Sequence, residues 1–228
     1  MYQLTLSIEN NKNYKLLKSL NNNDNVFNHL IDCTNILIDI YKDNYEDYIA
    51  PVMLHDIGKF IDKNNYKKHP SVAYEYLLNN YTNDACILLP IKYHENDLDW
   101  RELIKNEPLY IESKEKEKIE FLCTLVRDID IISNMKKLDH EYSKENIELN
   151  IELVSLLENK KISQTINIEN DYDKILYILC GLSLIENNEC LEYIKENNIV
   201  KKLLLRLDEI DNRYTDKISN IIYEEYSL

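Results

Sequence analysis

The sequence predicts an all-α protein, and three observations lead to that prediction. Apolar residues recur at helical spacing along nearly the whole chain of 228 residues, as in helices with one buried face. The alternation that is typical of strands is confined to residues 2–8. The composition, 44% hydrophobic and 30% charged, is that of a globular protein. We therefore expect a core made of packed helices.

The first helix is expected to begin at Asp24, a residue type that caps helices, and to extend to about Asp39. Its apolar stripe contains a histidine, His29, which places a polar ring on the side of the helix that faces the core. The apolar members of the stripe are Val26, Leu30, Cys33, Leu37 and Ile40.

A second and a third helix are expected over roughly residues 46–57 and 69–78. The second carries His55 and Asp56 at its C-terminal end, where Gly58 can terminate it. The third opens with His69, followed by a proline and a serine, as helix starts often do.

A fourth helix is expected to begin at residue 83 or 84, to break near Pro90 and to resume as far as His94. The region that follows, residues 96–117, is rich in charge and contains a proline. We expect this region to be irregular.

A long helix is expected from about residue 114 to residue 135. Its apolar stripe includes Asp130, whereas Asp128 falls off the stripe. Periodicity therefore selects Asp130, with Asp128 as its competitor, as the acidic residue that points into the core.

From residue 147 onward we expect about four amphipathic helices, separated by asparagine-rich turns. No histidine lies in this half. We therefore predict two domains, a site-bearing helical domain over residues 1–140 and a helical extension of unknown role over residues 141–228.

Charge and glycine content exclude several classes of function. The net charge of −14 repels phosphate backbones, so non-specific nucleic-acid binding is not expected. The two glycines, Gly58 and Gly181, cannot build a phosphate-binding glycine loop. A small anionic substrate is still compatible with the sequence, because a bound divalent cation reverses the local field.

Cysteine usage and hydropathy indicate where the protein works. The five cysteines form no C-x-x-C pair, and their odd number suits a reducing compartment. The start of the chain does not read as a secretory leader, and the longest apolar run, residues 176–185, is too short for a bilayer. We expect a cytoplasmic protein without a membrane partner, for which a homo-oligomer is compatible with the sequence.

One ordered series of polar residues dominates the chain. Each member is an imidazole or a carboxylate, the ligand types that bind transition metals. The series contains four of the five histidines and consists of His29, His55, Asp56, His69, His94 and Asp130.

The series predicts a metal site that several helices assemble. A buried carboxylate is costly unless something neutralises it, and a metal does so. Three or four ligands suffice for one ion, whereas six allow two ions, with Asp56 as the natural bridge. Mixed nitrogen and oxygen ligation suits Mn, Fe, Co, Ni or Zn. We therefore predict one or two divalent transition metals per chain.

The motifs around these residues resemble the HD superfamily of metal-dependent phosphohydrolases. Residues 54–59, Leu-His-Asp-Ile-Gly-Lys, match the HDIG variant, and the order H…HD…D is the family signature. The segments around His69 and His94 resemble the two extra histidines of the dinuclear members, and residues 126–130 resemble the closing aspartate motif, with Asp130 as the ligand.

This resemblance covers residues 24–140 and implies a fold and a reaction. The implied fold is the HD-type helical bundle. The implied reaction is hydrolysis of a phosphate ester, expected to be a small nucleotide, by a metal-activated water, with Asp56 and Lys59 as catalytic residues and Lys59 as a phosphate contact. Tyr93 stands where the family often has a second histidine, and residues 96–100 lack the glycine-tyrosine-proline extension of the cyclic-di-GMP phosphodiesterases.

Two other functions are compatible with the same residues. Some proteins with this fold and a similar six-ligand set bind two irons and activate oxygen. In the other alternative, the metal only stabilises a regulatory domain. Simpler interpretations also exist for single residues: His29 as a core histidine, His69 as a residue that orients a helix start, His94 as a phosphate donor, and Lys59 as an ordinary solvated lysine.

Overall fold

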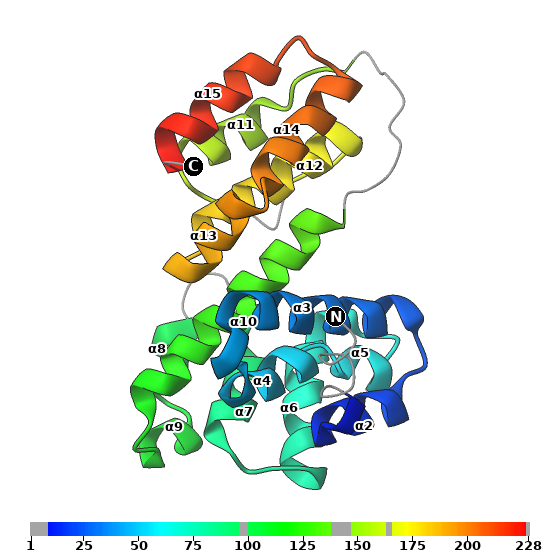
Figure 1. Cartoon of the computed structure of the whole chain (residues 1–228), viewed down its shortest axis with the longest axis vertical. Helices are drawn as coiled ribbons and strands as arrows, with labels where there is room; N and C mark the ends of the chain where they lie inside the picture. Colours follow the sequence, from blue (N-terminus) through cyan, green and yellow to red (C-terminus); the bar gives the residue numbers. More distant parts are fainter. Residues whose placement is uncertain (1–8, 96–99, 138–146, 163–165, 227–228) are drawn as a thin grey trace. The chain divides into compact units, whose positions relative to one another are not determined.

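The computed structural model describes residues 9–95, 100–137, 147–162 and 166–226 (Figure 1). In these segments the regular structure is helical and no strand occurs, which confirms the all-α class. The alternating residues 2–8 lie outside this part of the chain. No helix within it combines the length and the apolar character that a membrane span needs.

The chain divides into two compact units, residues 1–129 and 130–228. The division falls inside one continuous helix, α10 (Lys116–Lys136). The domain boundary predicted near residue 140 falls in residues 138–146, which are outside the described part, so it stays a prediction.

The N-terminal unit is built from short helices around a few longer ones. Before α10 they are α2 (Lys12–Leu20), α3 (Asp24–Tyr41), η1 (Lys42–Asp47), α4 (Ile49–Leu54), α5 (Gly58–Ile61), η2 (Tyr66–Lys68), α6 (His69–Asn80), α7 (Ala85–Tyr93), α8 (Trp100–Ile104) and α9 (Pro108–Glu112).

The core of this unit lies around α4. Five of its six residues are buried, among them Met53 and Leu54 at 0% exposure. Helix α4 packs against α3 and α7, while α6 packs against α5 and α7. The C-terminal ends of α4 and α7 and the start of α6 therefore belong to one packed group of helices.

The predicted helix from Asp24 is confirmed, with a different cap. The side-chain oxygen of Asn23 accepts hydrogen bonds from the backbone N–H groups of Asn25 and Val26, so the cap is Asn23 and Asp24 is the first helical residue. A carboxylate in the first turn still suits the helix dipole.

The single helix predicted over residues 46–57 is wrong. The chain forms η1, then α4, and then a turn at residues 55–57. Pro51 explains the first break, because its ring would clash with the carbonyl of residue 47 in a continuous helix, whereas the first turn of α4 tolerates it.

Gly58 begins α5 instead of terminating a helix, and its φ is not positive. A Cβ at this position would lie 2.0 Å from the backbone oxygen of His69. Glycine is therefore required here for the close approach of α5 to α6.

The region expected to be irregular, residues 96–117, contains two short helices, α8 and α9, in its described part. Pro108 is the first residue of α9, the position at which a missing N–H costs nothing. The long helix predicted after it is confirmed as α10.

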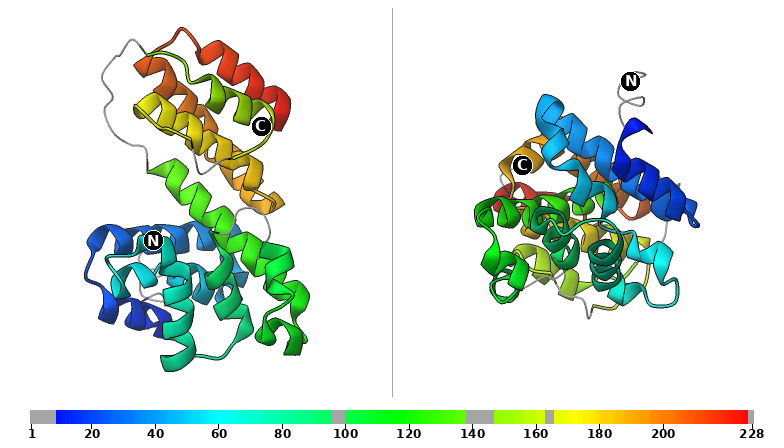
Figure 2. Two further views of the ribbon diagram at one scale, coloured as in Figure 1. Left: turned by 180° about the vertical axis from the view of Figure 1, so that it is seen from behind. Right: turned by 90° about the horizontal axis from the view of Figure 1, so that it is seen from below.

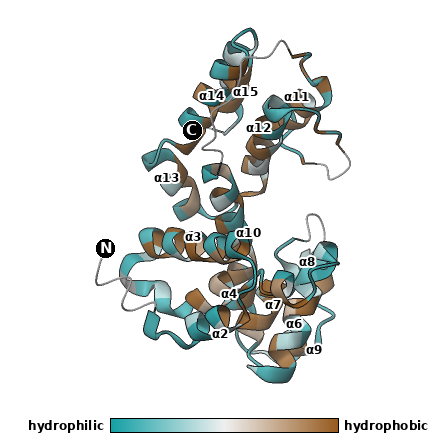
Figure 3. Ribbon diagram, turned by 90° about the vertical axis from the view of Figure 1, so that its right-hand side faces the viewer, coloured by the Kyte–Doolittle hydropathy of each residue, from teal (hydrophilic) through white to brown (hydrophobic). Residues whose placement is uncertain are grey.

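The C-terminal unit contains the end of α10 and a bundle of amphipathic helices, as predicted. Figures 1 and 2 show α11, α12, α14 and α15 lying side by side, and Figure 3 shows hydrophobic and hydrophilic residues mixed along them. The elements are α11 (Ile151–Glu158), α12 (Asp171–Cys180), η3 (Gly181–Leu184), α13 (Asn188–Glu196), α14 (Ile199–Ile210) and α15 (Thr215–Tyr226).

Polar side chains connect the turns of this unit. Asn170 caps α12 by accepting from the backbone N–H of Asp173. Arg213 forms an ion pair with Asp211 and also donates to the carbonyl of Ile147, 2.8 Å away. The segment before α11 is thereby tied to the turn between α14 and α15.

Candidate metal centre

Asp56 is the centre of a buried polar cluster in the N-terminal unit. Its Oδ1 lies 2.7 Å from Nε2 of His69 and 3.5 Å from Nε2 of His94. Its Oδ2 lies 3.6 Å from Nε2 of His29 and 3.8 Å from Nε2 of His55. None of these five residues is more than 6% exposed. The structure thus brings together five of the six residues of the predicted series around one carboxylate.

Helix ends position three of the imidazoles. His55 follows α4, His94 follows α7, and His69 follows η2 as the first residue of α6. The last carbonyls of a helix lack backbone partners, and a ring at its end can satisfy one of them. In each ring Nδ1 lies close to the backbone carbonyl oxygen three residues earlier. The distance is 2.8 Å in His55, to Val52, and 2.6 Å in His69, to Tyr66. In His94 it is 2.8 Å, to Ile91.

These contacts determine the tautomer of each neutral ring. A carbonyl oxygen only accepts, so Nδ1 carries the proton and Nε2 carries the lone pair. Fixing Nδ1 in this way is how proteins commonly orient a metal-binding histidine. All three rings therefore present an Nε2 lone pair to the cluster.

Two of these lone pairs meet. Nε2 of His69 lies 3.1 Å from Nε2 of His94, and both atoms face Oδ1 of Asp56. Two neutral nitrogen acceptors and a carboxylate oxygen repel one another unless a proton or a cation lies among them. Imidazole nitrogen with carboxylate oxygen is a donor set that fits a transition-metal ion.

Among the residues that the structure describes, three groups of side chains could hold a metal ion, because the ligand atoms in each group lie within 4.8 Å of one another. The groups share His55 or His94, so that neighbouring positions are linked by a common ligand. They consist of His29, Cys33, His55 and Asp130; of His55, Asp56 and His94; and of His69, His94 and Glu95.

The charge state of Asp56 suits a metal ligand. Burial raises the pKa of this carboxyl group, but its contacts with His55, His69 and His94 and with the ammonium of Lys59 outweigh that effect and lower the pKa. The net effect holds the pKa of Asp56 well below its usual range. The side chain is therefore an ionised carboxylate at neutral pH.

Lys59 lies at the edge of the cluster. Its Nζ is 2.6 Å from Oδ2 of Asp56, and its side chain is 23% exposed. The ammonium group thus occupies the boundary between the buried carboxylate and the surface.

The assignment of the two aspartates of α10 by helix periodicity is wrong in one respect. Asp128 does not fall off the buried side, because it is 0% exposed, whereas Asp130 is half-buried. Residues 122–129 are all buried, so an apolar stripe cannot distinguish the faces of this part of α10. The distances between ligand atoms, not the periodicity, place Asp130 in a group with His29 and His55.

Two of the grouped residues, Cys33 and Glu95, are not among those that the sequence predicts. Cys33 follows His29 by one helical turn, a spacing that brings two side chains to the same face. Glu95 directly follows His94, and its side chain is 48% exposed. The four-residue spacing is the signal in the sequence that could have identified Cys33.

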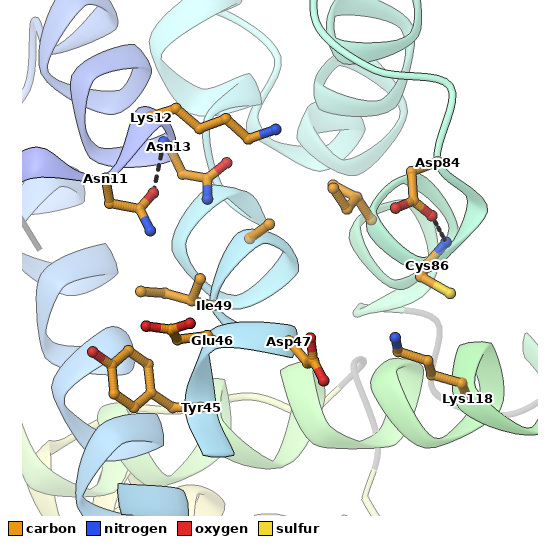
Figure 4. Close-up of a pocket in the computed structure, with 12 residues that line it drawn as sticks. Asn11, Lys12, Asn13, Tyr45, Glu46, Asp47, Ile49, Asp84, Cys86 and Lys118 are labelled. Atoms are coloured by element: carbon orange, nitrogen blue, oxygen red, sulfur yellow. Dashed lines mark hydrogen bonds between the residues drawn. The ribbon is translucent and has the colours of Figure 1, made fainter. Parts of the chain in front are cut away.

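A separate cavity of about 450 Å³ opens in the same unit, and none of the grouped residues lines it (Figure 4). Lys12 and Lys118 face it together with acidic residues, and Asp84 caps α7 beside it by accepting from the N–H of Cys86. Its mixed charge does not resemble the donor set around Asp56.

Comparison with known proteins gives no further guidance: no family model, curated protein or solved structure matches this chain.

Proposed function

We propose that the chain is a metal-dependent phosphohydrolase or phosphodiesterase that acts on a phosphate ester, with a small nucleotide as the expected substrate. The proposal rests on the order of the motifs, which resembles the HD superfamily. The observation that carries it is the convergence of buried Nε2 lone pairs on the carboxylate of Asp56.

In this proposal the chain's own residues hold and orient the metal and the substrate. His29, His55, Asp56 and Asp130 would hold one ion, and His69 and His94 would complete a second position that shares Asp56. A bound divalent ion lowers the pKa of water from 15.7 towards about 7, which supplies a nucleophile at neutral pH.

Lys59 favours a phosphate-directed reaction over the alternatives. An ammonium group at the rim of the cluster can exchange its contact with Asp56 for a phosphate oxygen once a metal neutralises the carboxylate. This cation at the cluster edge suits an anionic substrate in a chain whose net charge is −14.

The test combines metal analysis with a substrate panel. Protein purified without chelators should contain one or two transition-metal ions per chain, and with Mn or Co it should release phosphate from at least one nucleotide or phosphodiester. Asp56→Asn should abolish both occupancy and hydrolysis. Asp32→Asn, a matched change on the exposed face of α3, should leave both unchanged.

Other results would favour the alternative functions. Two irons per chain with a mixed-valence spin signal and no hydrolysis would favour the oxygenase. A metal-loaded protein that is inert towards every substrate, and whose only response to metal is a higher unfolding temperature, would favour the regulatory domain.

A further inference from the structure

One of the three ligand groups, that of His29, Cys33, His55 and Asp130, contains a sulfur donor, the thiol of Cys33, besides nitrogen and oxygen. Cys33 and His29 lie one helical turn apart, and both are buried, at 0% and 6% exposure. The ring of His55 packs edge-on against that of His29, with centroids 5.3 Å apart. A thiol therefore stands beside two imidazoles within one unit of the chain.

We propose that Cys33 is a thiolate ligand of the metal held by His29 and His55, so that the centre has one sulfur-containing position and one position of nitrogen and oxygen only. This proposal rests on the metal centre of the proposed function and adds to it the kind of ion that each position takes.

The distances fit a shared ion. Sγ of Cys33 lies 3.8 Å from both ring nitrogens of His29. Bonds to one zinc-like ion are about 2.3 Å for sulfur and about 2.1 Å for nitrogen, so two such donors lie at most about 4.4 Å apart and about 3.6 Å apart at a tetrahedral angle.

The second imidazole is oriented for the same ion. Nδ1 of His55 donates to the carbonyl of Val52, so Nε2 carries the lone pair of the neutral ring. Its ligand atom lies within 4.8 Å of those of His29, Cys33 and Asp130. Two imidazole nitrogens and one sulfur, together with the carboxylate ligands of the proposed function, make up a mixed donor set of the kind that zinc and cobalt accept.

The other cysteines do not share this environment. Burial raises the pKa of the Cys86 thiol to about 11 and that of Cys180 to about 12, and it also raises the pKa of Cys123. Neither these three nor Cys190 joins an imidazole in any of the ligand groups of the described segments. Cys33 is the cysteine that a metal could deprotonate on binding.

A soft sulfur donor changes which metal the position selects. Thiolate ligation favours Zn, Co or Fe, whereas carboxylate ligation suits Mn. The position at Cys33 should therefore take Zn or Co first, and the position formed by His69, His94 and Glu95 should be the one that accepts Mn.

Cobalt titration of the metal-free full chain tests this assignment without using activity. The wild-type protein should show a sulfur-to-cobalt charge-transfer band in the near ultraviolet that saturates with the first equivalent. Cys33→Ala should lose the band and bind the first cobalt at least about tenfold more weakly. Cys33→Ser should also lose the band but recover part of the affinity, because its hydroxyl can still coordinate.

Cys123→Ala is the matched control, since it removes another buried thiol, and it should keep the band unchanged. Cobalt binding by the wild type without the band, or a band that survives in Cys33→Ala, would overturn the cysteine assignment and leave the metal centre standing. No cobalt binding at all would overturn both.

Discussion

Replacing Gly58 by alanine tests the contact that brings α5 onto α6. A Cβ at this position would lie 2.0 Å from the backbone oxygen of His69, 2.8 Å from its carbonyl carbon and 2.9 Å from its Cα. An unstrained carbon–oxygen contact is about 3.3 Å, so the two backbones must separate by roughly 1 Å. All three atoms are backbone, so no side-chain rotation can relieve the clash.

Two effects of opposite sign determine how much Gly58→Ala changes the free energy of unfolding. Overpacking of this kind costs about 1–3 kcal/mol or more. Alanine also lowers the backbone entropy of the unfolded chain, which stabilises the folded state by about 0.4–1 kcal/mol. Because no side chain can move to relieve the clash, the cost lies at the upper end of its range, and we expect Gly58→Ala to lower the free energy of unfolding by about 2 kcal/mol or more. A 1 Å shift of His69 also exceeds the tolerance of about 0.2 Å for metal–ligand distances, so metal affinity should fall as well.

Urea unfolding of the full chain, with metal analysis of the same preparations, measures both effects. The other glycine of the chain is the control. At Gly181 an added Cβ meets only the side chains of Ile131, at 3.2 Å, and Met135, at 3.8 Å, and these can move. Gly181→Ala should change stability by less than about 1 kcal/mol. Equal effects of the two substitutions would refute the reasoning.

Three further predictions address single contacts. Tyr93→Phe removes a hydroxyl that lies 2.5 Å from Oε1 of Glu107; it should cost about 1–3 kcal/mol in thermal or urea unfolding and leave metal occupancy unchanged. Lys59→Met removes an ammonium that lies 2.6 Å from Oδ2 of Asp56 and competes with a metal for this oxygen. Calorimetry should therefore show metal binding that is tighter by up to about tenfold. Phosphate release should slow, because the substrate loses a cationic contact. Asp211→Asn removes an ion pair of the C-terminal unit that holds the pKa of this carboxyl group below its usual range. A lowered pKa contributes stability above the unfolded value of about 3.9 and loses it as the pH falls through the folded value. The stability difference from wild type should therefore be constant between about pH 5 and 8 and shrink below about pH 4, as urea titrations at several pH values would show.

The helices that the sequence predicts well are those with one buried face. Helix α3 begins and ends within a few residues of its predicted bounds, because one side of it meets water along most of its length. Helix α4 fails as a prediction for the opposite reason. Its residues are buried nearly all round, so periodicity carries no information there, and Pro51 decides where it begins.

The degree of burial also decides which residues of the candidate site the sequence can predict. The histidines stand out because buried imidazoles are uncommon, and their order along the chain is enough to predict a common centre. Asp128 and Asp130 cannot be separated by periodicity, because α10 is buried on every side at this point. Cys33 does not stand out, because a cysteine in an apolar stripe is also an ordinary core residue.

The histidine geometry also shows which part of the centre depends on local structure. Each of His55, His69 and His94 donates Nδ1–H to a carbonyl three residues earlier, so each ring is oriented by its own helix end. The meeting of the rings depends on the tertiary packing of α4, α6 and α7 around Asp56. Removal of a metal should therefore leave the orientation of each ring intact and weaken only the packing between helices, since the repulsion among the Nε2 lone pairs is then no longer offset by a cation.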